Sequence, residues 1–446
     1  MLGKGKIRDI TDRVLALSTA DQTEVLLLGE ESGLTRFANS YIHQNVAECN
    51  AELRVRVVVG KKVGVASTND LSDEALQRVV ETALTVASFQ QENPDFTSLP
   101  QPAPLSKVSG FVERTAAFTP EARAKAVGVI CRLAREKGLT ASGAFTTATY
   151  ELAVANSLGV FAYYPTTLAD LNTVIMSDDS SGYADATSLD VAEIDPEAVA
   201  TEAVGKAIRS RDPQEIEPGE YAVVLEEYAV ADLLLHLSIL GFGALAVQEK
   251  RSFMCDRFGE RIMDERISIW DDGLDPKGLP MPFDFEGVPK QRVDLIERGV
   301  AKAVVYDTYT AGREEGKTST GHALPAPNTF GPIPFNMFMQ PGVATKEEML
   351  ASTERGIWVT RFHYTNPVHP LKTIITGMTR DGTFLIEDGE LARPIKNLRF
   401  TQSILEALSR VEMVGETTKL ERAFLGAISV PTLRIEGFNF TGTTQF

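Results

Sequence analysis

The chain has 446 residues, too many for one ordinary hydrophobic core, so two or three domains are expected. Hydrophobic residues make up 43% of the chain and charged residues 24%, a balance typical of globular and not of disordered proteins. The formal net charge of −17 would repel phosphate backbones, and no Lys/Arg-rich stretch offsets it, so direct nucleic-acid binding is disfavoured.

The cysteines and the N-terminal residues indicate the cellular compartment in which the protein is expected. The cysteines are Cys49, Cys131 and Cys255, an odd and widely spaced set without a CxxC pair, which argues against a disulfide framework. The segment 1–13 carries basic residues but lacks the apolar stretch of a secretory signal. We therefore expect a cytoplasmic protein.

The first segment reads as strands followed by a helix. β-branched residues and partial alternation predict three strands separated by turn residues, over 23–31, 34–48 and 51–68. Apolar spacings of three and four then predict a helix over 71–90 with Ser72 as its N-cap. Four prolines between 92 and 110 mark a boundary, which gives an N-terminal α/β domain over 1–108.

A second strand-plus-helix unit follows, over 109–216. Thr119 and Pro120 are typical of a helix N-cap and first helical position, and Asp195 and Pro196 repeat this pattern for a closing helix. Strand-like sequence lies between the two helices, with a turn predicted at 156–159.

The remaining residues, 217–446, predict a larger β-rich domain. It opens with a strand over 220–227 and an apolar run over 228–247 that is long enough to cross a bilayer. Asp232 and His236 inside this run favour a buried core helix, so we expect no membrane span. Further on, the dipeptides at 298–299, 381–382 and 388–389 are typical hairpin turns. The fold class predicted for the whole chain is α+β.

Two groups of residues are candidates for chemistry. Asp232 and His236 are four residues apart and would share a helix face, either as metal ligands or as a hydrogen-bonded pair within the core. His322, His363 and His369 lie in predicted loops, and three imidazoles could hold zinc with one position open. Their spacing matches no established ligand pattern, so surface histidines are the competing interpretation.

Acidic residues gather between 271 and 286 and offer oxygen ligands for a hard cation. They are Asp271, Asp272, Asp275, Asp284 and Glu286. Their spacing is not that of a calcium loop, and solvated turns explain them equally well.

An ordered series of motifs resembles one family, the TldD/PmbA proteins, also called modulators of DNA gyrase. These motifs are TRFANSYIHQN (35–45), ANSLGV (155–160), GERI after RSFM (251–262), the long stretch 282–311, STGHA (319–323), LIEDGEL (385–391) and VPTLRIEGF (430–438). The resemblance implies an N-terminal α/β region, a β-rich C-terminal domain, and a peptidase built from two kinds of subunit. A TldD-like subunit holds zinc and encloses unfolded peptides for cleavage, and a PmbA-like (TldE) subunit lacks the metal.

The resemblance places this chain on the PmbA/TldE side. TldD-like members carry HExxxH on the helix that opens the third domain, and here its positions fall at or beside Leu235, His236 and Leu240. The alternative register, with His236 as the first histidine, puts Leu237 and Gly241 at the next two positions. The expected cysteine ligand near the C-terminus is also missing between 419 and 431. We therefore expect no catalytic or metal-binding residues in this chain and zinc in a TldD-like partner.

These observations predict a TldE/PmbA-like subunit of a metallopeptidase that degrades unfolded peptides. Its dimer partner would be a TldD-like homologue or a second copy of itself. The alternative is a stand-alone metal-dependent hydrolase that uses Asp232 and His236 or the three loop histidines. A third interpretation is a self-assembling binding protein without metal or a TldD-like partner.

Overall fold

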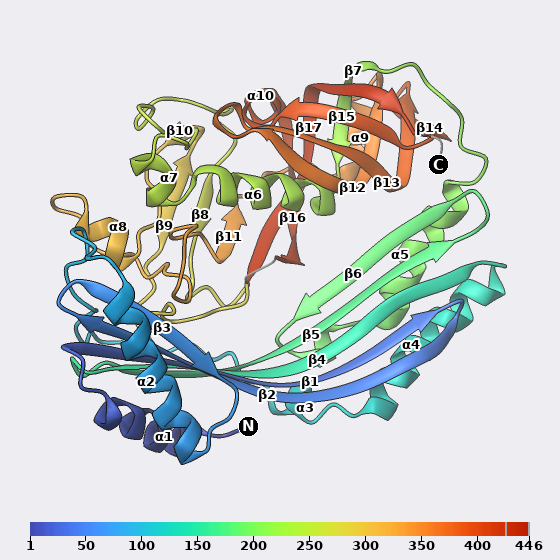
Figure 1. Cartoon of the computed structure of the whole chain (residues 1–446). Helices are drawn as coiled ribbons and strands as arrows, with labels where there is room; N and C mark the ends of the chain where they lie inside the picture. Colours follow the sequence, from blue (N-terminus) through green and yellow to red (C-terminus); the bar gives the residue numbers. More distant parts are fainter. Residues whose placement is uncertain (424–425, 445–446) are drawn as a thin grey trace.

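The structure, a computed structural model, describes residues 1–423 and 426–444. An N-terminal six-stranded sheet carries helices on one face, and a C-terminal region built mainly of strands lies over the other face (Figure 1). The predicted α+β class is confirmed.

The six strands of the first sheet are antiparallel and lie in the order β3-β2-β1-β4-β5-β6. They are β1 (Gln22–Ala38), β2 (Tyr41–Val59), β3 (Lys62–Thr68), β4 (Thr140–Asn156), β5 (Phe161–Met176) and β6 (Ser181–Ser188). Because β1 pairs with β4 along most of its length, the two strand-plus-helix units share a single continuous sheet.

The predicted turns within the first unit were misplaced. β1 continues through Gly33, β2 continues through Cys49 and Asn50, and the hairpin turn falls at Asn39 and Ser40, both of which have positive φ. Gly33 is compatible with the strand because its missing side chain leaves room for the Arg123 guanidinium, whose atoms would lie 2.4 Å from a Cβ there.

Four helices cover one face of this sheet. They are α1 (Lys4–Leu17), α2 (Asp73–Phe89), α4 (Pro120–Glu136) and α5 (Pro196–Arg209), with the short elements α3 (Glu113–Ala116) and η1 (Val191–Glu193) between them in sequence. The predicted caps Thr119 and Asp195 are confirmed, because their side chains accept hydrogen bonds from backbone N–H groups in the first turns of α4 and α5. Ser72 occupies the predicted N-cap position of α2, but its side chain makes no capping hydrogen bond. α1 was not predicted.

The alternation of side chains along β1 assigns its two faces. Val25 and Leu27 pack with α1 and α2, and Leu26 and Leu28 pack against Phe283 and neighbouring residues of the C-terminal region. Successive residues of a strand point to opposite faces, so β1 is covered on both sides. The sheet face opposite the helices therefore forms one wall of the junction between the two regions.

The C-terminal strands form one sheet of eleven. They are β7 (Gly219–Leu225), β8 (Ile269–Asp271), β9 (Val293–Glu297), β10 (Val300–Ala301), β11 (Asn336–Met339), β12 (Arg355–His369), β13 (Ile374–Glu387), β14 (Glu390–Pro394), β15 (Leu398–Ser403), β16 (Val411–Arg422) and β17 (Ala427–Thr443). β17 pairs with both β15 and β7, so β7, β12, β13, β15 and β17 close into a ring.

Two of the three predicted hairpins in this region are confirmed. Turns at 298–299 and 388–389 join β9 to β10 and β13 to β14. The turn predicted at 381–382 is wrong, because β13 runs through both residues. Asp381 and Gly382 have positive φ beside a register shift against β12, so the dipeptide forms a bulge within a long strand.

The helices of this region are short except for the first. They are α6 (Glu227–Gly241), α7 (Ala244–Gln248), α8 (Thr308–Gly312), α9 (Lys346–Ala351), α10 (Ile404–Ser409) and η2 (Pro370–Lys372). α6 packs against β12 and β17 of the ring, as expected for a core helix. Of the helices in residues 1–423 and 426–444, none combines the length and apolarity that a membrane crossing requires.

Candidate functional site: the junction between the two regions

Helix α6 carries the first pair of candidate residues. Its apolar residues are buried almost all round, and Asp232 and His236 share a half-buried face, as predicted. The Nδ1 atom of His236 lies 2.8 Å from the backbone oxygen of Asp232 and 3.6 Å from its Oδ1. Burial raises the pKa of Asp232, and His236 and the Thr365 hydroxyl partly oppose this shift. The pair is thus a local hydrogen-bonded unit on the helix.

The donors on α6 do not fit a zinc site of the HExxxH type. The backbone contact of His236 Nδ1 leaves Nε2 as the one imidazole nitrogen available on this helix face. Leu240, one turn further on, is 7% exposed and packs in the core, and its side chain has no donor atom. In the described part of the chain, no group of three or more His, Cys, Asp or Glu residues is arranged to hold a metal ion. Phe424 and Leu425, within the segment where the resemblance places a cysteine ligand, lie outside the described residues.

The three loop histidines do not form a cluster. His322 is completely buried, and its Nε2 donates a hydrogen bond of 2.7 Å to Asp271, while Nδ1 lies 2.9 Å from the Thr320 hydroxyl. The prediction that they lie in loops is wrong for His363 and His369, which lie on β12, half-buried and exposed respectively. Burial, reinforced by a nearby lysine, lowers the pKa of His322 to about 4, so its imidazole is neutral at physiological pH.

The acidic stretch is largely buried, so the interpretation as solvated turns is wrong for three of its members. Asp271 and Asp284 are 0% exposed and Glu286 is 6% exposed. Asp284 accepts hydrogen bonds from three backbone N–H groups, those of Glu286, Val288 and Ala323. Burial, with the neighbouring Glu286, raises the pKa of Asp284 to about 7. These carboxylates are components of the junction.

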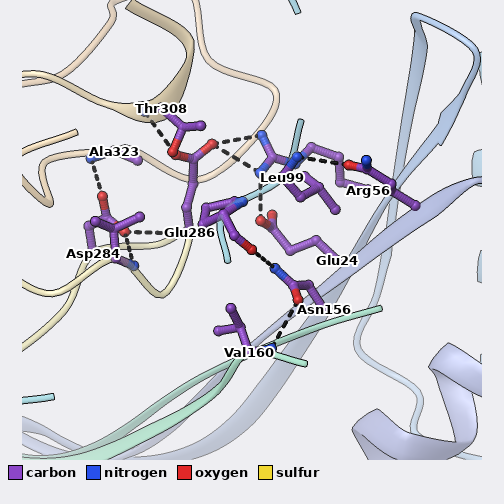
Figure 2. A network of polar contacts seen from close by, with 12 residues as sticks. Glu24, Arg56, Leu99, Asn156, Val160, Asp284, Glu286, Thr308 and Ala323 are labelled. Atoms are coloured by element: carbon purple, nitrogen blue, oxygen red, sulfur yellow. Dashed lines mark hydrogen bonds and ion pairs between the residues drawn. The ribbon is translucent and has the colours of Figure 1, made fainter. Parts of the chain in front are cut away.

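An ion-pair network connects the two regions (Figure 2). Arg56 on β2 lies directly opposite Glu24 on β1, and its guanidinium donates to Glu24 at 2.5 Å and to Glu286 of the C-terminal region at 2.9 and 3.0 Å. The second oxygen of Glu286 accepts from the backbone N–H of Thr308 at 3.2 Å. Burial raises the pKa of Glu24 to about 7, although Arg56 opposes the shift. The guanidinium therefore neutralises carboxylates from both sides of the junction.

A cavity of about 450 Å³ lies at the same junction. One wall comes from β1, β2, β4 and β5 of the first sheet, and the other from loop residues between 273 and 290, Phe335, Asn336 and the end of β16. The wall is mainly apolar; its apolar side chains include Leu28, Leu152, Leu168, Leu279, Met281 and Phe285. Lys290, which is 4% exposed, also lines this cavity.

No local sequence pattern identifies the junction residues Glu24, Arg56 and Lys290. Arg56 lies in LRVRVVV, where charged residues alternate with apolar ones, a pattern typical of one solvated sheet face. That face is instead covered by the C-terminal region. A prediction that both faces of β1 and β2 are buried would have identified Arg56 as a residue needing a partner.

The fold defines a class of protein in which a sheet covered by helices on one face packs against a C-terminal domain built around a ring of strands. A mainly apolar cavity with a few charged residues lies between them. Profiles of three domains match the chain: PmbA/TldA metallopeptidase domain 1 over 23–87, the central domain over 111–211, and the C-terminal domain over 218–442. The chain belongs to the PmbA/TldD family, which confirms the resemblance found in the sequence.

Individual relatives agree with this assignment. The chain is 24% identical to metalloprotease PmbA of Escherichia coli O157:H7, an alignment that covers 95% of this chain and 94% of that protein. It is 24% identical to a metalloprotease TldD homologue of Haemophilus influenzae, covering 93% and 86%. Among solved structures, TldE from Thermococcus kodakarensis has the same fold, with a TM-score of 0.89, 20% identity and coverage of 98% of this chain and 100% of that one.

Proposed function

We propose that this chain is the PmbA/TldE-like subunit of a two-subunit metallopeptidase that degrades unfolded peptides, and that it binds peptide while a TldD-like partner supplies zinc. The observation that carries the proposal is the chemistry of α6. Where the family's zinc helix needs a second histidine and a glutamate, this helix presents aliphatic side chains around a single imidazole. Without these groups the helix can neither hold the ion nor activate a water.

The junction supplies features that suit peptide binding. The cavity is largely apolar, as expected for a site that accepts the side chains of unfolded segments. β16 extends from the C-terminal region toward the six-stranded sheet, and its end borders the cavity (Figure 1). Among the described strands, β16 forms a ladder only with β17, and residues 342–344 hydrogen-bond to its other edge at 414–416. The rest of that edge, over 417–422, is able to receive an extended peptide.

The test is reconstitution. The chain is purified alone and with a TldD-like homologue bearing HExxxH, bound zinc is measured by atomic absorption, and cleavage of an unfolded reporter protein is followed. We expect substoichiometric zinc and no cleavage for the chain alone, and cleavage by the mixture that exceeds that of the partner alone. One zinc per chain together with cleavage by the isolated chain would refute the proposal and favour the stand-alone hydrolase.

A further inference from the structure

Lys290 is a buried cation without a hydrogen-bond partner. Its Nζ atom is shielded from solvent and makes no hydrogen bond in the part of the chain that the structure describes. The ammonium lies over the Phe335 ring in a cation–π interaction, with the ring centre 4.1 Å away. Burial lowers the pKa of Lys290 to about 8, an effect that Asp271 and Asp284 partly oppose. A buried ammonium without a hydrogen-bond acceptor is costly even beside carboxylates, which makes the missing acceptor a meaningful observation.

The two nearby carboxylates are engaged elsewhere. Asp271 accepts hydrogen bonds from His322 and from the backbone N–H groups of Phe335 and Asn336. Asp284 accepts three backbone N–H bonds within the loops around it. Neither carboxylate forms an ion pair with Lys290 among the described residues, although both contribute to its electrostatic surroundings. The hydrogen-bonding capacity of the ammonium thus remains free.

The cavity beside Lys290 has walls of unlike charge. Its acidic lining residues, Glu30, Glu52 and Glu151, come from the six-stranded sheet, whereas Lys290 and Arg422 come from the C-terminal region. The Glu151 carboxylate binds the backbone N–H groups of Leu2 and Gly3, and Glu52 pairs with Arg54, so the charge on this wall is that of Glu30. Arg422 already contacts Asp170 at 3.4 Å. An anionic group in the cavity would therefore be repelled by Glu30 on the sheet wall and drawn to the opposite wall, where the Lys290 ammonium has no hydrogen-bond partner among the described residues.

Size and apolar character limit the ligand further. A volume of about 450 Å³ is at the small end of ligand pockets and accommodates a few residues of an extended chain. Leu168 on the sheet and Met281 and Phe285 on the opposite side provide apolar surface for side chains. The matching ligand combines a short apolar body with one terminal carboxylate.

We propose that the cavity binds the C-terminal end of a peptide, with Lys290 as the counter-ion of its terminal carboxylate and the apolar walls around its last side chains. This inference rests on the proposed peptide-binding function and adds the direction in which the bound peptide runs. A bound peptide has its carboxylate at the C-terminal wall of the junction and its preceding backbone along the sheet.

The test compares two probes that differ only in terminal charge: N-acetyl-Ala-Leu-Phe with a free carboxylate, and the same peptide as its C-terminal amide. Binding to the full chain, alone and with the TldD-like partner, is measured by isothermal titration calorimetry. We expect the acid to bind at least tenfold more tightly than the amide. In Lys290→Met the two should bind within about twofold, and in Lys277→Met, an exposed lysine of the same loop, the preference for the acid should persist.

Each outcome bears on one proposal. Equal binding of acid and amide to the unaltered protein overturns the role of Lys290 and leaves peptide binding intact. An acid preference that survives Lys290→Met likewise excludes Lys290 as the counter-ion. If neither probe binds with or without the partner, while an unfolded protein substrate does bind, the cavity does not bind the C-terminal end of a peptide, but the proposed function stands. Failure of all peptides and unfolded proteins to bind refutes both.

Discussion

Replacing Arg56 by methionine tests whether the ion pairs at the junction hold the two regions together. In the native protein the Arg56 side chain is 13% exposed and neutralises Glu24 and Glu286, whose side chains are 4% and 8% exposed. Methionine has similar length but no charge, so it would leave both carboxyl groups facing an apolar side chain. Glu286 would retain only the Thr308 N–H as a hydrogen-bond donor.

The expected cost follows from the need to protonate Glu286. A carboxyl group with an ordinary pKa near 4.3 takes up a proton at a cost of about 3.7 kcal/mol at pH 7 and about 1.6 kcal/mol at pH 5.5. Glu24 adds little to the difference, because burial already raises its pKa to about 7 in the native protein. We expect Arg56→Met to lower the free energy of unfolding by about 3–4 kcal/mol at pH 7, within the range for broken buried ion pairs, and by about half as much at pH 5.5.

Urea unfolding at both pH values, followed by far-ultraviolet circular dichroism and tryptophan fluorescence, measures this effect. Both tryptophans, Trp270 and Trp358, lie in the C-terminal region, so a separation of the two transitions would show that the regions have uncoupled. The control is Arg132→Met, which removes an exposed pair with Glu136 on α4 and should cost at most about 0.5 kcal/mol. A loss below about 1 kcal/mol at pH 7, or one independent of pH, would refute the role assigned to Arg56.

Three further predictions concern the packing at two glycines, the role of His363 and His369, and the titration of His322. Gly182→Ala should lower the free energy of unfolding by about 1–3 kcal/mol, because its Cβ would lie 2.2 Å from a backbone oxygen of α5. Gly128→Ala, in open space on α4, should raise the free energy of unfolding by about 0.5–1 kcal/mol. Equal urea midpoints for the two variants would contradict this packing. The double variant His363→Ala/His369→Ala should leave cleavage by the reconstituted complex unchanged, and a loss at unaltered stability would instead favour a catalytic role. The ring of His322 should show no titration by NMR between pH 5 and 8. Because its pKa in the folded state is about 4, below the unfolded value, its contribution to stability is present above pH 6.5 and is lost as the pH falls toward 4; a midpoint near 6.5 would be incompatible with its burial.

Secondary structure was predictable where local chemistry determines it. The starts of α4 and α5 follow from Thr119 and Asp195, whose side chains cap the first turn whatever the surroundings. The hairpin at 388–389 likewise follows from an Asp-Gly pair that favours positive φ. The same dipeptide at 381–382 forms a bulge, because the pairing of β13 with β12 continues past it. The identity of a turn residue therefore specifies backbone conformation but not whether a strand ends.

The family and the fold class were predictable from ordered motifs, but the composition of the junction was not. Arg56 and Glu286 are 230 positions apart, and nothing in either neighbourhood indicates the other. The stretch 271–286 has the composition of exposed turns, yet three of its carboxylates are buried because distant backbone N–H groups and a distant guanidinium satisfy them. Whether a charged residue is solvated depends on such tertiary partners.

That dependence explains why Lys290 differs from the other junction charges. Asp271 and Asp284 are buried with their hydrogen bonds made, so each is accounted for as part of the folded chain. Arg56 forms ion pairs with two buried carboxylates, although its Nε has no partner among the described residues. The Lys290 ammonium is buried to the same degree and lacks that satisfaction, although an aliphatic side chain at this position would avoid the cost. The charge of Lys290 is partly balanced by the buried carboxylates of Asp271 and Asp284, and an anionic ligand in the adjoining cavity would add the hydrogen-bond acceptor that neither of them supplies. Lys290→Met should therefore weaken the binding of a peptide acid, and it should also lower the stability of the free chain, because Asp271 and Asp284 lose a neighbouring cation.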